Sequence, residues 1–112
     1  MIETNARTAV ADPLSESVRR LRGSMPAERI YLFGSRARGE ATEESDFDFL
    51  VVVQDSPLPR YKREQQAFRA LCDIGIAKDV LVFTRREFEK GLAVVTSLPA
   101  TVAREGRLIY GG

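Results

Sequence analysis

Residues 33–53, Phe-Gly-Ser-Arg-Ala-Arg-Gly-Glu-Ala-Thr-Glu-Glu-Ser-Asp-Phe-Asp-Phe-Leu-Val-Val-Val, determine how the rest of the chain is arranged. The segment begins at the end of an apolar run, Ile30 to Phe33, which breaks at Gly34-Ser35. After a polar connection that contains a second glycine, the apolar character resumes beyond Asp46. This pattern predicts a strand, a tight turn with a short helix, and a second strand.

Two carboxylates open the second of these strands. Alternate side chains of a strand lie on one face of its sheet, so Asp46 and Asp48 should point the same way, and Phe47 and Phe49 should point the other way into apolar packing. Neighbouring carboxylates repel one another unless a cation lies between them. Mg²⁺ prefers oxygen ligands and would supply that charge. The pair therefore predicts a metal site at the mouth of a sheet.

Gly34-Ser35 supplies the complementary feature, a phosphate site. Glycine at a strand-to-helix turn adopts backbone conformations that other residues resist, and it lets a ligand approach the main chain. Ser35 can cap the short helix that follows, and the free amides at a helix start bind phosphate. A phosphate site beside metal-binding carboxylates indicates a nucleotide carried as its metal complex.

The composition limits the possible classes of protein. At 112 residues the chain is long enough for one domain, 1–112, in which residues 1–11 lack periodicity and are expected to form a flexible arm. Hydrophobic residues make up 44% and charged residues 29%, as expected for a domain with a real core and a hydrated surface. With 17 basic and 16 acidic residues, the net charge of +1 gives no electrostatic basis for general nucleic-acid binding.

The single cysteine and the absence of histidine exclude further chemistries. An internal disulfide, an ordinary structural zinc site and histidine-based acid–base catalysis are all excluded. Cys72 is expected to be a small core residue within a long helix. The N-terminal residues lack the features of a secretory signal, and no apolar run approaches the ~20 residues needed to span a bilayer. We therefore expect a cytoplasmic protein without membrane association.

A helix should begin at Asp12-Pro13 and end between Gly23 and Pro26, because Leu14, Val18 and Leu21 form one apolar stripe. The remaining expected elements are a strand over 29–33, a short helix from Ser35 that ends by Gly39, a strand over 46–53, a helix over 60–77, a strand over 78–84, a helix from Thr84 or Arg85 through about Lys90, a short helix over 99–105 and a strand over 107–110.

These elements predict an α/β (α+β) fold in which a small mixed sheet is flanked by helices. The helix between the second and third strands is long enough for a crossover between parallel strands. Parallel pairing would bring Asp79, at the start of the third strand, beside Asp46 and Asp48. The first strand must run antiparallel to the second to bring Gly34-Ser35 to the same edge.

The motif Gly34-Ser35-x-x-x-Gly39 followed by Ser45-Asp46-x-Asp48 resembles the signature of the DNA polymerase beta-like nucleotidyltransferase superfamily, and in its compact form that of the minimal nucleotidyltransferases. The resemblance implies the nucleotidyltransferase fold, with Asp79 as the third acidic residue. Asp46 and Asp48 would then bridge two Mg²⁺ ions, and Asp79 would hold one ion near the attacking hydroxyl.

The implied reaction transfers a nucleoside monophosphate from ATP or another NTP to a hydroxyl group. Ser35 and the amides around Gly34 would hold the terminal phosphates of the leaving pyrophosphate. Arg36 and Arg38 are near enough in sequence to neutralise developing charge, although the family pattern fixes neither of them.

Minimal nucleotidyltransferases are similar to the antitoxin halves of toxin–antitoxin systems whose toxins are HEPN-domain ribonucleases. That resemblance implies adenylyl transfer onto a tyrosine of a partner HEPN toxin. Two alternatives remain open: a non-catalytic module that neutralises a partner by contact, and nucleotidyl transfer to a small molecule. The sequence does not specify the nucleotide, the acceptor, the preferred metal or the oligomeric state.

Overall fold

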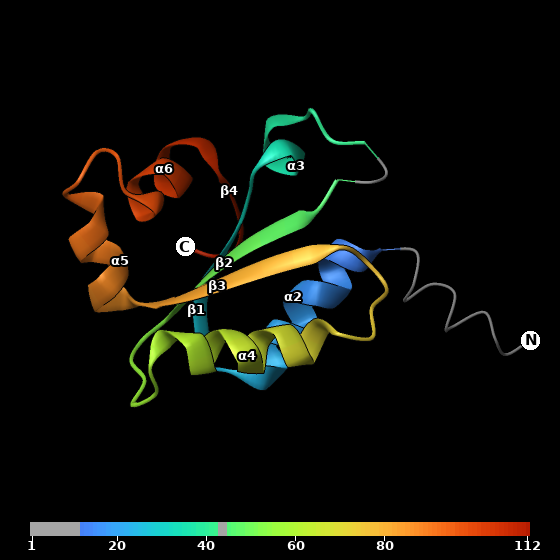
Figure 1. Cartoon of the computed structure of the whole chain (residues 1–112), viewed down its shortest axis with the longest axis horizontal. Coiled ribbons are helices and arrows are strands. Elements are labelled where there is room, and N and C mark those ends of the chain that lie inside the picture. The colour runs from blue at the N-terminus through green and yellow to red at the C-terminus, as the bar shows by residue number, and fades with distance from the viewer. Residues whose placement is uncertain (1–11, 43–44) are drawn as a thin grey trace, which may run out of the picture.

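The computed structural model describes residues 12–42 and 45–112, so the expected arm at 1–11 lies outside the described residues. A four-stranded mixed sheet with strand order β3-β2-β1-β4 forms its centre (Figure 1). The strands are β1 (Ala27–Phe33), β2 (Phe47–Val53), β3 (Lys78–Thr84) and β4 (Arg107–Gly111). The predicted directions are confirmed: β1 is antiparallel to β2 and β4, and β2 is parallel to β3.

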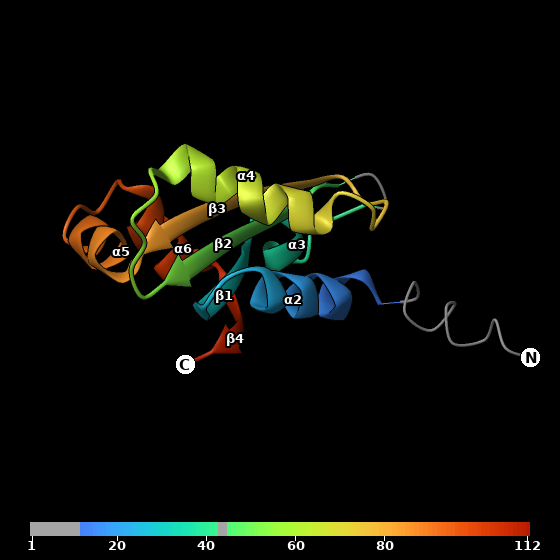
Figure 2. The ribbon, with the colours of Figure 1, turned by 90° about the horizontal axis from the view of Figure 1, so that it is seen from below.

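Five helices surround this sheet in the described part of the chain: α2 (Pro13–Ser24), α3 (Ser35–Arg38), α4 (Arg60–Leu71), α5 (Arg85–Leu92) and α6 (Leu98–Glu105). Figures 1 and 2 show α2 and α4 on one face of the sheet, with α5 and α6 on the other. None of the helices in this part of the chain has both the length and the apolar character needed to cross a bilayer.

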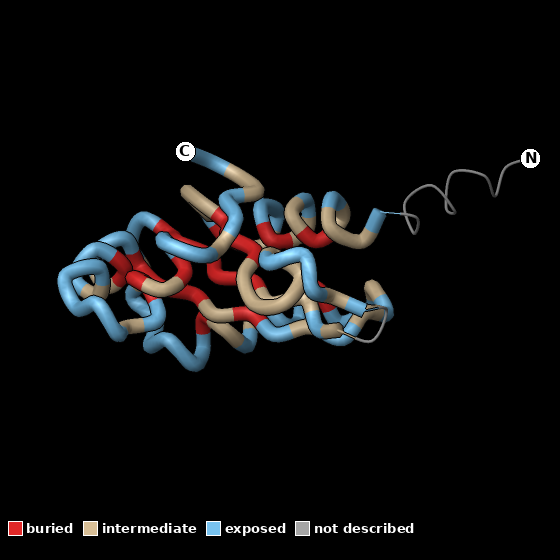
Figure 3. Tube along the Cα trace, turned by 90° about the horizontal axis from the view of Figure 1, so that it is seen from above, coloured by how far each residue is buried: buried red, intermediate tan, exposed pale blue. Residues whose placement is uncertain are grey.

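The alternation of side chains along β2 creates a separate core on each face. Phe49 and Val51 pack with Leu21 of α2 and Leu71 of α4, whereas neighbouring β2 side chains pack on the other face with residues of α5 and α6. Figure 3 shows these buried segments running between the layers. The predicted inward orientation of Phe47 and Phe49 is confirmed, because both belong to the first of these cores.

The predicted helix starts are also confirmed. Asp12 caps α2 by accepting a hydrogen bond from the Ser15 amide, at 3.3 Å. Thr84 and Glu87 form a reciprocal capping box at the start of α5. The predicted bounds of these elements differ from the observed ones by a residue or two, as expected for ends that fray.

The prediction for α4 was too long. The helix ends at Leu71 rather than at residue 77, and the exposed Cys72 lies just beyond it instead of in the core. Gly75 adopts φ +85°, a left-handed conformation that interrupts a helix and turns the chain toward β3. Tyr61, in the first turn of α4, is 60% exposed.

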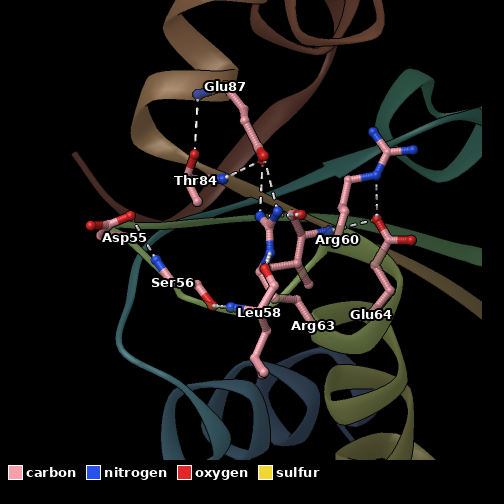
Figure 4. Close-up of polar contacts among 9 residues, drawn as sticks. Asp55, Ser56, Leu58, Arg60, Arg63, Glu64, Thr84 and Glu87 are labelled. Carbon is pink, nitrogen blue, oxygen red and sulfur yellow. Dashed lines mark hydrogen bonds and ion pairs between the residues drawn. The ribbon is translucent and has the colours of Figure 1, made fainter.

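A buried arginine instead occupies the inner side of α4. The Arg63 side chain is 6% exposed, and its guanidinium makes two 2.9 Å hydrogen bonds to the carboxylate of Glu87 (Figure 4). It also donates to the carbonyls of Leu58 and Val82 at 3.1 and 3.2 Å. These bonds tie α4, β3 and α5 together and satisfy a charge that would otherwise be costly to bury.

This ion pair predicts a specific loss of stability in acid. The hydrogen bond from Arg63, opposed by burial and reinforced by the Thr84 amide, lowers the pKa of Glu87 to about 2 from its ordinary 4.5. Because the pKa is lower in the folded state, the stabilisation is complete above pH 4.5 and disappears as the pH falls toward 2.

Glu87→Gln should therefore lower the free energy of unfolding by about 1 kcal/mol near neutral pH, a modest value because the Glu87 side chain is 42% exposed and water screens the pair. Urea denaturation across the acid range should show the two proteins converging at low pH. Glu89→Gln, on the exposed side of the same helix, is the control and should follow the wild type. A constant gap between wild type and Glu87→Gln would contradict the assignment.

The buried hydroxyl of Ser17 lacks a hydrogen-bond partner among the described residues, and its residue is 0% exposed. Because an unsatisfied buried hydroxyl is destabilising, Ser17→Ala should raise the free energy of unfolding by about 1 kcal/mol. Ser15→Ala on the same helix removes a hydroxyl that donates to Asp12 at 2.6 Å and should not stabilise. Thermal denaturation of both variants tests this difference, and equal effects would contradict it.

Candidate active site

The register of the sheet brings the predicted acidic residues to one edge. Asp48 of β2 lies opposite Phe33, the last residue of β1, and opposite Asp79 near the start of β3. Asp46 is exposed and lies just before β2. The end of β1 and the starts of β2 and β3 therefore meet at the edge of the sheet that also carries α3 (Figure 1). The spatial convergence predicted from the crossover is present, while metal binding by these residues stays a prediction.

Asp48 is the most perturbed carboxyl group at this edge. Its residue is partly buried, and this desolvation raises the pKa of Asp48 above the usual 3.8; the negative charges of Asp46 and Asp79 raise it further. The environment therefore disfavours a third negative charge beside the other two. A bound cation would reverse that preference.

Gly34 is required by both its backbone conformation and its contact with Asp48. Its φ of +77° and ψ of −157° lie where residues with a side chain are strained. A Cβ atom at this position would also overlap Oδ2 of Asp48 and lie 3.3 Å from its Cγ. The absence of a side chain thus lets the turn close directly onto the carboxylate.

The structure corrects the predicted role of Ser35 as a helix cap. Gly34 is the N-cap of α3 and Ser35 is the first helical residue, so no side-chain hydrogen bond caps this helix. Gly34 makes the turn itself, in a conformation that only glycine adopts easily, so Ser35 already lies inside the helix rather than at its cap. The first helical bonds run from the amides of Ala37 and Arg38 to the Gly34 carbonyl, at 3.1 and 3.2 Å.

Arg36 anchors the loop that leads into β2. Its guanidinium donates to the Ser45 carbonyl at 2.9 Å and to the Thr42 carbonyl at 3.2 Å, and it lies 3.9 Å from the centre of the Phe47 ring. Arg38 forms an ion pair with Glu40 at 3.0 Å. These contacts give both arginines structural partners, and phosphate binding by either one stays a prediction.

Loop anchoring by Arg36 was not predicted. The sequence offers one signal for it: an aromatic residue directly after the Ser45-Asp46 pair, at a distance that a short loop can close. In cation–π contacts of this kind, the cation that lies over the aromatic ring is more often arginine than lysine.

Asp79 is exposed, and its Oδ1 accepts a hydrogen bond from the amide of Val80 at 3.0 Å. Within residues 12–42 and 45–112, no three acidic or cysteine side chains are already arranged closely enough to hold a metal ion. The oxygen donors and the mutual repulsion at this edge nevertheless suit a hard divalent cation such as Mg²⁺. The chemistry of the site fits a metal, although its ligands are not fully assembled.

Residues 12–108 match the nucleotidyltransferase domain family. The chain belongs to this family. The match includes β1, the Gly34 turn, β2 and β3, which together build the acidic edge.

The domain is also similar to a curated protein of Methanocaldococcus jannaschii named "putative protein adenylyltransferase". The two are 36% identical over 55 residues, which cover 49% of this chain and 54% of the relative. The chain thus matches about half the length of that relative.

Solved structures share the fold. A "putative nucleotidyltransferase" from Sulfolobus solfataricus superposes with a TM-score of 0.63 at 26% identity, over 98% of this chain and 86% of the other. A variant of the toxin–antitoxin pair MntA-HpeT gives 0.53 at 26% identity, over 88% and 72%. A toxin–antitoxin structure with AMP-PNP gives 0.54 at 24% identity, over 88% and 73%, and supports the fold alone.

Proposed function

We propose that this domain transfers the adenylyl group of ATP to a hydroxyl group of a partner protein, and that the partner is a HEPN-domain toxin modified on a tyrosine. The observation that carries the proposal is the register that places Asp48 opposite Asp79, with the Gly34 turn closed against Asp48. The name of the M. jannaschii relative supports adenylyl transfer to a protein, and the likeness to MntA-HpeT supports a toxin as partner.

In this proposal Asp46, Asp48 and Asp79 hold the metal. Two bound Mg²⁺ ions would neutralise the three carboxylates and the triphosphate and make the α-phosphorus more electrophilic. To bind the metal, Asp79 would have to give up the hydrogen bond that it accepts from the Val80 amide. The raised pKa of Asp48 supports the assignment, because carboxylates that repel each other in the metal-free site favour a cation between them.

The acceptor oxygen attacks the α-phosphorus of ATP and forms a new oxygen–phosphorus bond. The bond between that phosphorus and the oxygen bridging to the β-phosphate breaks, and pyrophosphate leaves with the electron pair. Asp79 accepts the proton of the acceptor hydroxyl. The amides at Gly34-Ser35 and the Ser35 hydroxyl orient the departing phosphates, as free amides at the start of a helix do.

The test uses the purified domain with the protein encoded beside it, Mg²⁺, and ATP labelled at either the α- or the γ-phosphate. Label should reach the partner from α-labelled ATP only, and Asp46→Asn should abolish the transfer. Neutralisation of a toxic partner that survives Asp46→Asn, with no label transferred, would instead establish the non-catalytic binding module.

A further inference from the structure

An open groove of about 630 Å³ follows the outer edge of β3 beside α4. Its lining includes Tyr61, Phe68, Arg69 and Cys72 of the α4 region together with Asp79 and Val80 of β3. Because Asp79 is the carboxylate assigned to the acceptor hydroxyl, the groove shares this residue with the proposed active site. Figure 2 shows α4 running alongside β3 over this length.

The α4 side of the groove exposes aromatic surface. Tyr61 and Phe68 are 60% and 47% exposed, and their spacing of seven residues places them on one side of the helix. Lys78, the residue before Asp79, places its Nζ 5.2 Å from the centre of the Phe68 ring. Exposed rings of this kind stack well against another aromatic side chain.

The groove also contains an unpaired positive charge. Within the described parts of the chain, no carboxylate lies within 4.0 Å of the Arg69 guanidinium, whereas the neighbouring Glu64 is paired with Arg60 at 3.3 Å. An acidic side chain on an incoming segment would give Arg69 a partner.

Extended backbone pairing with β3 is not available to a ligand in this groove. The amides of Val82 and Thr84 already donate to the side chains of Glu64 and Glu87, at 3.1 and 2.9 Å, which leaves only the Val80 amide for pairing once Asp79 holds the metal. Side-chain capping of this kind protects an edge strand from the addition of another strand. A bound segment must therefore be recognised mainly through its side chains.

We propose that this groove docks the acceptor segment of the modified protein, with a tyrosine ring against Phe68 and an acidic neighbour against Arg69. The inference rests on the proposed function and adds to it the surface that selects the acceptor. Ring stacking favours an aromatic hydroxyl over serine or threonine, and the open groove directs that hydroxyl toward Asp79.

The first test measures the binding of a short fluorescent peptide with a central tyrosine flanked by glutamates, in the presence of Mg²⁺ and a non-hydrolysable ATP analogue. Phe68→Ala should weaken binding about tenfold, because truncating an aromatic anchor of an interface costs that much. Val95→Ala is the matched control, since Val95 is 73% exposed on the α5–α6 connection, and it should bind as the wild type does. Replacing the glutamates of the peptide with lysines should also weaken binding.

The second test uses Cys72, the only cysteine of the chain. Alkylation with a bulky maleimide should block the groove and weaken peptide binding to a similar extent. The control carries Cys72→Ser with Val95→Cys and is alkylated in the same way at a distant exposed position. Its peptide affinity should not change.

Mg–ATP binding, measured separately with a fluorescent ATP analogue, distinguishes the two proposals. The groove is not the acceptor site if Mg–ATP binds but the peptide does not, or if neither Phe68→Ala nor Cys72 alkylation changes the affinity for the peptide. In either case the proposed function still stands. If Mg–ATP does not bind the intact domain, the proposed function fails, and the acceptor role of the groove fails with it.

Discussion

Asp48→Asn should abolish adenylyl transfer while leaving the domain at least as stable as the wild type. Asp48 lies between the Gly34 turn and Asp79, so its loss removes the central ligand of the proposed metal site. Transfer should fall on the order of a thousandfold or more, because the developing phosphate charge loses its main electrostatic stabilisation. Label transfer from α-labelled ATP measures this loss.

The same substitution that abolishes transfer should leave the stability of the domain unchanged or increase it. Burial and the charges of Asp46 and Asp79 raise the pKa of Asp48, so its ionised form is disfavoured in the folded domain. This destabilisation is complete above the raised pKa and is relieved as the pH falls through it toward 3.8, because the folded state binds the proton more tightly. Metal-free Asp48→Asn should therefore melt at an equal or higher temperature near neutral pH.

Asp55→Asn is the matched control for both measurements. Asp55 is exposed beyond the opposite end of β2, and its Oδ1 accepts a 2.8 Å hydrogen bond from the Ser56 amide. Its replacement should leave transfer intact. A catalytically active Asp48→Asn variant, or one that loses activity only because it unfolds, would contradict the assignment of Asp48.

Gly34→Ala should damage both stability and activity, whereas Gly39→Ala should damage stability alone. The two glycines have nearly the same φ, +77° and +76°, but their ψ values, −157° and 18°, differ. Alanine at Gly39, in the left-handed helical region, should cost about 1–2 kcal/mol of backbone strain. At Gly34, in a region that only glycine occupies readily, it should cost about 1–3 kcal/mol. Only at Gly34 would the new methyl group meet Asp48, since nothing lies within 4 Å of a Cβ at Gly39. We expect Gly34→Ala to lower transfer by about a hundredfold or more, as displacement of a catalytic group does.

A double-mutant cycle isolates the contact itself. In the Asp48→Gly background the carboxylate is absent, so Gly34→Ala should cost only its own backbone strain. Chemical denaturation of the four proteins gives the coupling free energy between Gly34 and Asp48. A coupling of zero, or identical losses of activity at Gly34 and Gly39, would show that the turn does not position the carboxylate.

The acidic edge could be predicted because its determinants are local. The break at Gly34 and the apolar runs on both sides of it defined two strands, and the helical segment before Asp79 required a parallel crossover. Chain direction alone then placed Asp48 and Asp79 side by side, as the observed register shows. The position of each carboxylate along its strand was therefore available from the sequence.

The contacts of the charged side chains could not be predicted from the sequence in the same way. Arg63 is buried because Glu87, 24 residues away, and two backbone carbonyls satisfy its guanidinium, and only the folded chain brings these groups together. Arg36 likewise contacts a loop carbonyl and the Phe47 ring rather than pointing freely toward a phosphate.

The end of α4 illustrates a third limit. The residues after Leu71 are compatible with a helix, but the chain must turn back to start β3, and Gly75 provides the left-handed conformation for that turn. The balance between local helix propensity and this tertiary requirement is set by the whole fold.

The central claim is that Asp46, Asp48 and Asp79 together hold a metal-bound triphosphate beside the Gly34 turn. Paramagnetic broadening of backbone amide NMR signals by Mn²⁺–ATP tests it without any acceptor. We predict broadening around Gly34, Asp48 and Asp79, little effect at Val53 and Thr84 at the opposite ends of β2 and β3, and loss of the effect in Asp48→Asn. Broadening centred elsewhere, or unchanged in Asp48→Asn, would contradict the account.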